Sequence, residues 1–188
     1  MRPGGLAWRK VADDNGGHAN VQPPGRTGVI LTVPALLAAL KPGQRLLGLD
    51  PGSKTIGVAV SDVGRMIANP HTALKRAKLA INAKEIMALA HKLDAGGLVI
   101  GLPLSMDGSL GPAAQAARDW ARALSDATQL PIALWDERLS SAAVNRFLID
   151  EADLSRARRA ALVDRMAAAY LLQAALDASG AFGENRSA

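Results

Sequence analysis

The sequence predicts an α/β fold in which a mixed five-stranded sheet carries helices on both faces. Near the start, two apolar runs are joined by residues 51–54, a connection too short for a crossover, so these strands are antiparallel. Further along, apolar runs alternate with helical stripes, the pattern of parallel strands linked by helices. With 188 residues, 49% of them hydrophobic, the chain can bury one core.

The elements follow from local composition. Residues 1–43 are rich in Gly, Pro and charge and are predicted to be a largely disordered N-terminal extension, with a short helix near 35–40. The domain is expected to span 44–179, followed by a flexible tail at 180–188. Strands are predicted at 45–50, 55–61, 66–69, 97–102 and 131–135, and helices at 78–93, 112–128, 140–151 and 157–178.

Composition excludes several classes of site and location. Cysteine is absent and only three His are present, so a metal would have to be bound by carboxylates, which favours Mg²⁺ or Mn²⁺. No apolar run reaches membrane-spanning length and no secretory signal is visible, so we expect a cytoplasmic protein without a membrane partner. The net charge of +5 weakly favours polyanions, and an aromatic content of 3% argues against base stacking.

Acidic residues follow two of the apolar runs directly. Asp50 ends the first predicted strand, and Asp136 and Glu137 end the last. Ligand sites in open α/β sheets lie at the carboxyl ends of parallel strands, where a buried charge needs a partner or a cation. Asp164 is the third acid. Its neighbours at helical spacing are Ala and Leu, so it lies on the helix face that packs on the sheet.

Each acid also has an ordinary structural explanation. Asp50 precedes Pro51 and suits a turn, Glu137 can pair with Arg138, and Asp164 can complement a helix dipole. It is less probable that all three ordinary explanations hold together than that any one of them holds. Carboxylates that converge repel one another unless divalent cations neutralise them, and such a cluster suits metal-assisted phosphodiester hydrolysis.

Four ordered segments resemble the YqgF (RuvX) family of Holliday-junction-resolvase-like proteins, which are assigned as pre-16S rRNA nucleases. The segments are GLDPGSKTIGVAVSD at 48–62, GLPLSMDGS at 101–109, DERLS at 136–140 and VDRMAA through LQ at 163–173. The resemblance implies an RNase H-like fold, with Asp50, Glu137 and Asp164 as catalytic and metal-binding acids. It leaves Asp136 as the alternative to Glu137 for the second metal-binding acid, and Asp107 as an outer-sphere acid. Members often have Arg where Thr55 stands.

Substrate contacts are expected next to the acids. The loop at 101–111 joins a buried strand to a helix, and its amides, with Ser109, can bind a phosphate, although a plain connection has the same composition. Lys54 and Arg138 flank the acids and can steady a scissile phosphate or pair with a neighbouring acid.

The leading hypothesis is a divalent-metal-dependent endonuclease for structured nucleic acid, with processing of the 5′ end of precursor 16S rRNA implied by the resemblance. The alternatives are a Holliday-junction-type DNA resolvase and a non-catalytic nucleic-acid or transcription-complex binding module. An ATP-binding domain of the actin type also has an Asp-x-Gly loop, but it needs two such domains. The partner would be precursor rRNA or a DNA junction, and the protein a monomer or a homodimer.

Overall fold

The computed structural model describes residues 29–105, 107–139 and 156–184, without the side chains of 139, 156–161 and 181–184. Within these residues a six-stranded sheet has the order β1-β6-β5-β2-β3-β4. Its strands are β1 (Ile30–Leu31), β2 (Arg45–Pro51), β3 (Thr55–Ser61), β4 (Ala68–Lys75), β5 (Ala95–Leu102) and β6 (Ile132–Asp136). The helices are α1 (Val33–Ala39), α2 (Leu79–Leu93), α3 (Pro112–Thr128) and α5 (Arg156–Glu184), with a 3₁₀ turn at Glu137–Leu139.

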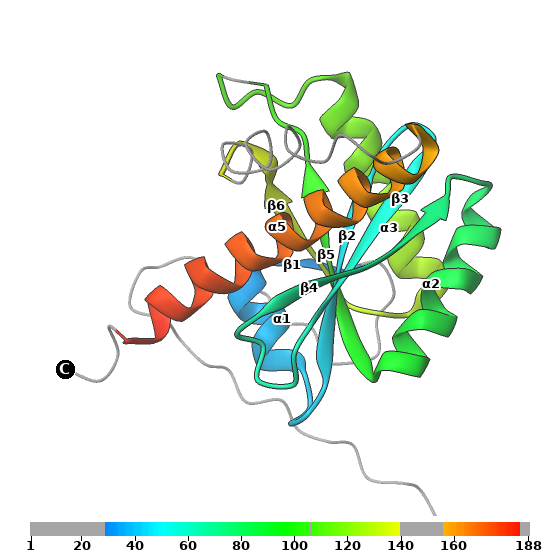
Figure 1. The fold of residues 1–188 in the computed structure, drawn as a ribbon. Helices are drawn as coiled ribbons and strands as arrows, with labels where there is room; N and C mark the ends of the chain where they lie inside the picture. Colours follow the sequence, from blue (N-terminus) through cyan, green and yellow to red (C-terminus); the bar gives the residue numbers. More distant parts are fainter. Residues whose placement is uncertain (1–28, 106, 140–155, 185–188) are drawn as a thin grey trace, which may run out of the picture.

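The sheet is mixed, as predicted. β2, β3 and β4 form an antiparallel meander, whereas β2, β5, β6 and β1 run parallel. Figure 1 shows α5 crossing one face of the sheet, with α2 and α3 on the other. The two faces bury separate cores, one against α2 and α3 and the other against α1 and α5. Helices on both faces confirm the predicted α/β architecture.

The predicted strand count of five was wrong, since β1 adds a sixth strand. Ile30 and Leu31 pair in parallel with Ile132 and Ala133 at the edge of the sheet. The helix expected near 35–40 is present as α1, and its Leu36 is fully buried. Residues 30–39, which we expected to belong to the extension, therefore contribute to the core. Two residues are too few to show an alternating pattern, which is why the sequence did not reveal the strand.

The third strand lies further along the chain than expected. It was predicted at 66–69, but β4 covers Ala68–Lys75. The Asp62 carboxylate explains the shift, because it accepts hydrogen bonds from the backbone N–H groups of Gly64, Met66 and Ile67 and holds these residues in a turn. β4 then runs along the sheet edge, where a polar sequence is compatible with a strand.

The other elements agree closely with expectation. α3 matches its predicted range, and α2, β2, β5 and β6 differ by one or two residues. The final helix is longer than predicted and reaches Glu184, into the segment expected to be a flexible tail. The helix predicted at 140–151 lies outside the described residues, as do 1–28 and 185–188. No helix in the described part of the chain has both the length and the apolar character needed to cross a membrane.

Candidate active site

Strand alternation places Asp50 on the α5 face of the sheet. In β2, Leu47 and Leu49 pack into the core under α2 and α3, whereas Leu46 packs into the core under α5. Since successive side chains point to opposite faces, Asp50 follows Leu46 toward α5. It lies at the end of the central strand, where it pairs across the sheet with Gly57 of β3.

Glu137 reaches the same face from the end of β6. Its carboxylate lies over Gly101 of β5, where an added Cβ would come within 2.2 Å of Glu137 Oε1 and 2.7 Å of Leu171 Cδ1. Leu171 belongs to α5, so the Glu137 side chain lies between the sheet and that helix. A glycine at position 101 leaves the space that this carboxylate occupies.

Asp164 approaches from α5. The helix packs so closely on β3 that a Cβ at Gly57 would lie 1.9 Å from the Asp164 carbonyl oxygen. The Thr55 hydroxyl, at the start of β3, donates a hydrogen bond to Asp164 Oδ2. Gly57 is also the residue that pairs with Asp50 across the sheet. Asp164 is thereby held beside the end of β2.

Burial and mutual repulsion perturb two of the acids. The pKa of Asp50 is raised to about 6, mainly by burial and to a lesser extent by the negative charge of Asp164. Burial likewise raises the pKa of Glu137 to about 7, with the charges of Asp50 and then Asp136 as lesser causes. Asp50 therefore interacts with both other acids. Desolvated carboxylates that also repel one another are a common feature of functional sites.

The acids suit a divalent cation in their chemistry. All the donors are carboxylate oxygens, which Mg²⁺ and Mn²⁺ prefer, and the pKa values of two of the acids are raised by burial first and by mutual repulsion second. As the side chains stand, however, no three His, Asp or Glu residues among those described are grouped tightly enough to enclose an ion. The acids therefore form two neighbouring pairs, Asp50 with Asp164 and Asp50 with Glu137.

Asp136 lies apart from this group. Alternation along β6 directs Ile132 into the core under α2 and α3, and Asp136 lies on that side. Its carboxylate pairs with Arg138, whose Nη2 lies 2.6 Å from Asp136 Oδ2 and whose Nε lies 3.0 Å from Oδ1. Hydrogen bonds from the Arg138 side chain lower the pKa of Asp136. The two consecutive acids therefore have different neighbours: Asp136 pairs with Arg138, whereas Glu137 lies over Gly101.

The predicted substrate-binding residues lie around this edge. Arg138 Nη1 also reaches the Ser105 carbonyl oxygen at 3.4 Å, which joins it to the loop after β5. In that loop the Ser109 N–H donates to Asp107 Oδ1 at 2.9 Å, and hydrogen bonds from Ser109 lower the pKa of Asp107. Lys54 is exposed in the turn between β2 and β3, after the strand that carries Asp50. The structure brings Arg138 to the loop of Ser109 and leaves Lys54 in a separate turn.

Three residues that position the acids were missed as site residues in the sequence. Gly57 and Gly101 provide the space for Asp164 and Glu137, and Thr55 binds the Asp164 carboxylate. A glycine inside a strand pattern can indicate close approach of another group, and this signal was available at both positions. The role of Thr55 depends on a contact across 109 residues, which a single sequence does not show.

Comparison with known proteins gives one family and many close relatives. The profile of a family described as "RuvX: Holliday junction resolvase" matches residues 44–178. A protein of Gluconobacter oxydans is 63% identical over 140 residues, covering 74% of this chain and 88% of its own length. A protein of Gluconacetobacter diazotrophicus is 65% identical over 136 residues, covering 72% and 88%. Both relatives carry the name "Putative pre-16S rRNA nuclease".

Among solved structures, a RuvC of T. thermophilus in complex with a Holliday junction substrate matches at 14% sequence identity. The match covers 77% of this chain and 96% of that one, with a TM-score of 0.45. The yeast mitochondrial Holliday junction resolvase Ydc2 matches at 12% identity, with 82% and 87% coverage and a TM-score of 0.45.

Proposed function

The chain belongs to the RuvX family, and on this premise we propose that it is a nuclease that processes the 5′ end of precursor 16S rRNA in the cytoplasm. Its mixed sheet with helices on both faces is an RNase H-like fold. Residues 44–179 form the nuclease unit in this proposal. The observation that carries it is the gathering of Asp50, Glu137 and Asp164 on the α5 face at the carboxyl end of the central strands.

Asp50, Glu137 and Asp164 are the residues that would hold Mg²⁺ or Mn²⁺. The chemistry that a divalent cation supplies at such a site is neutralisation of the scissile phosphate and activation of the attacking water. Without a cation, pKa values of about 6 and about 7 leave Asp50 and Glu137 partly protonated near neutral pH. A nearby positive charge favours their ionised forms, so binding of the cation and deprotonation are coupled.

The remaining residues position the acids and the substrate. Thr55 orients the Asp164 carboxylate by a hydrogen bond, and Gly101 allows Glu137 to lie against the sheet. Arg138 is held by Asp136 and by the Ser105 carbonyl oxygen, so its guanidinium is fixed at the loop after β5 and can contact a phosphate of the substrate. Ser109 and Lys54 lie in two loops at the same edge and can contact the backbone on either side.

The family description also names a second substrate class, the four-way DNA junction. The experiment is therefore cleavage of 5′-labelled precursor 16S rRNA and of a DNA junction, each with Mg²⁺, Mn²⁺ or EDTA. We expect the wild type to cut the RNA only with a metal, and Asp164→Asn to bind it without cutting. Cutting of the junction alone would make the protein a resolvase. Binding without cutting under every condition would favour a non-catalytic module.

A further inference from the structure

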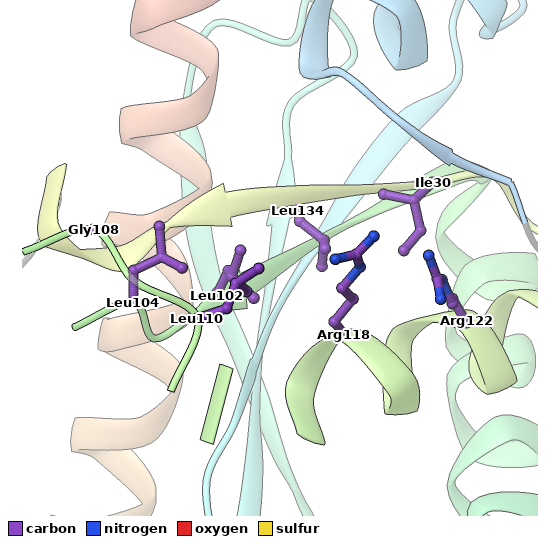
Figure 2. Close-up of a pocket in the computed structure, with 8 residues that line it drawn as sticks. All are labelled: Ile30, Leu102, Leu104, Gly108, Leu110, Arg118, Arg122 and Leu134. Carbon is purple, nitrogen blue, oxygen red and sulfur yellow. The ribbon is translucent and has the colours of Figure 1, made fainter. Parts of the chain in front are cut away.

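A hollow of about 510 Å³ lies beside α3 (Figure 2). Leu134 packs into the core under α2 and α3, so the hollow is on the face of the sheet opposite the acids. It is bounded by the ends of β1, β5 and β6, by the loop after β5 and by α3. Five aliphatic side chains make the apolar part of its lining: Ile30, Leu102, Leu104, Leu110 and Leu134. Its size lies within the range of small-molecule sites. None of the residues proposed for catalysis lines it.

Two arginines give the hollow its charge. Arg118 and Arg122 are one helical turn apart on α3, and Figure 2 shows both side chains beside Leu134 and Ile30. Neither guanidinium has an ion pair or a hydrogen bond with another described residue. None of the described residues that line the hollow is acidic. An apolar surface beside two positive charges is complementary to a ligand that has a flat apolar part and an anionic part.

The loop after β5 borders the hollow and also contacts Arg138. Gly108 lines the hollow and also lies against Arg138, whose Nη1 is 3.4 Å from the position of an added Gly108 Cβ. Arg138 directly follows Glu137 in the chain. A nucleic-acid strand with a phosphate at the acids would cross this loop and reach the hollow a few nucleotides away, because Ile30 of the hollow pairs with Ile132, five residues before Glu137.

We propose that this hollow binds one unpaired nucleotide of the substrate strand, a few nucleotides from the scissile phosphodiester. The leucines would contact the base, as apolar side chains do in enzymes that hold an unstacked base. Arg118 and Arg122 would contact the phosphates of that nucleotide. This inference rests on the proposed nuclease function and adds a preference for a cleavage site with a single-stranded flank.

The role of the two arginines is tested by measuring, by fluorescence anisotropy, how a short fluorescein-labelled single-stranded RNA binds to the full-length protein in EDTA. The test variant is Arg118→Gln/Arg122→Gln, and Lys84→Gln/Lys92→Gln removes the same charge from exposed positions on α2. Loss of two phosphate contacts should make the slope of log K against log salt shallower by about 1.4 in the arginine variant alone. Equal slopes in the two variants, or no binding by the wild type at low salt, would overturn the proposal.

The role of the aliphatic side chains is tested with 2-aminopurine placed in the single-stranded flank of a hairpin RNA. Its fluorescence should change when the wild type binds, and Leu110→Asn should reduce the change, whereas Ile81→Asn should not. The two side chains are similarly exposed, at 50% and 51%, so both variants should fold. The same change in all three proteins would overturn the proposal.

Both tests are made without metal and without cleavage, so they are independent of catalysis. A wild type that shows these binding effects but cuts no substrate contradicts the nuclease and leaves the nucleotide site standing. A wild type that cuts RNA, with the arginine variant binding as the wild type does, contradicts the nucleotide site and leaves the nuclease standing.

Discussion

Gly101→Ala should lower the cleavage rate about a hundredfold while leaving the fold intact. The added Cβ would lie 2.2 Å from Glu137 Oε1 and 2.7 Å from Leu171 Cδ1, whereas Cβ contacts below 3.0 Å essentially never occur. The carboxylate must therefore retreat by about 0.8 Å. Because both contacts are at the ends of flexible side chains, the backbone can stay in place. Displacement of a catalytic group by about 1 Å costs roughly a hundredfold in rate.

The stability change should be small. Overpacking costs about 1–3 kcal/mol, and replacing a glycine returns about 0.4–1 kcal/mol by restricting the unfolded chain. The assay is single-turnover cleavage of precursor 16S rRNA together with urea unfolding. Gly180→Ala is the matched control, because its added Cβ meets no atom within 4 Å. A cleavage rate for Gly101→Ala equal to that of the control would refute this placement of Glu137.

Three further predictions concern the other acids. Gly57→Ala should destabilise the protein by on the order of 3 kcal/mol in urea unfolding, because its Cβ would meet the Asp164 backbone carbonyl and α5 would have to move; a stability equal to that of the wild type would contradict the close packing of α5 on β3. In EDTA, stability should fall as the pH rises from about 4 through the raised pKa values of Asp50 and Glu137, since the folded state binds more protons than the unfolded chain over that window. Mg²⁺ should reverse this fall in thermal melts, and a flat profile in EDTA would show that the acids are not desolvated. Thr55→Val should weaken Mn²⁺ binding and activity by about 10–100-fold, and Thr55→Ser should restore both, as measured by calorimetry and cleavage; an unaffected Thr55→Val would show that the hydrogen bond to Asp164 has no positioning role.

The fold was predictable where the sequence is locally consistent. α3 begins at a proline, and β2 and β5 are continuous apolar runs bounded by turns, so local pattern and global fold agree. β1 and β4 were not predictable in this way, because a two-residue strand has no period and an edge strand tolerates polar residues.

The three acids could be proposed from their positions at strand ends and on an apolar helix face. Their relation to one another required the structure. The register of β2 and β3 and the packing of α5 on Gly57 reveal that Asp50 lies near Asp164. The position of Glu137 over Gly101 places it on the same face, where the charge of Asp50 acts on it. The same is true of the nucleotide site, whose two arginines lie on α3, on the face of the sheet opposite the acids.

The choice between Glu137 and Asp136 tests the account most directly. Glu137 lies on the α5 face with Asp50, whereas Asp136 pairs with Arg138 on the other side. The measurement is the single-turnover rate of precursor 16S rRNA cleavage in Mg²⁺ for Glu137→Gln and Asp136→Asn, prepared and assayed side by side. The account predicts that Glu137→Gln loses cleavage and that Asp136→Asn retains most of it. Loss in Asp136→Asn with retention in Glu137→Gln would contradict the site described above.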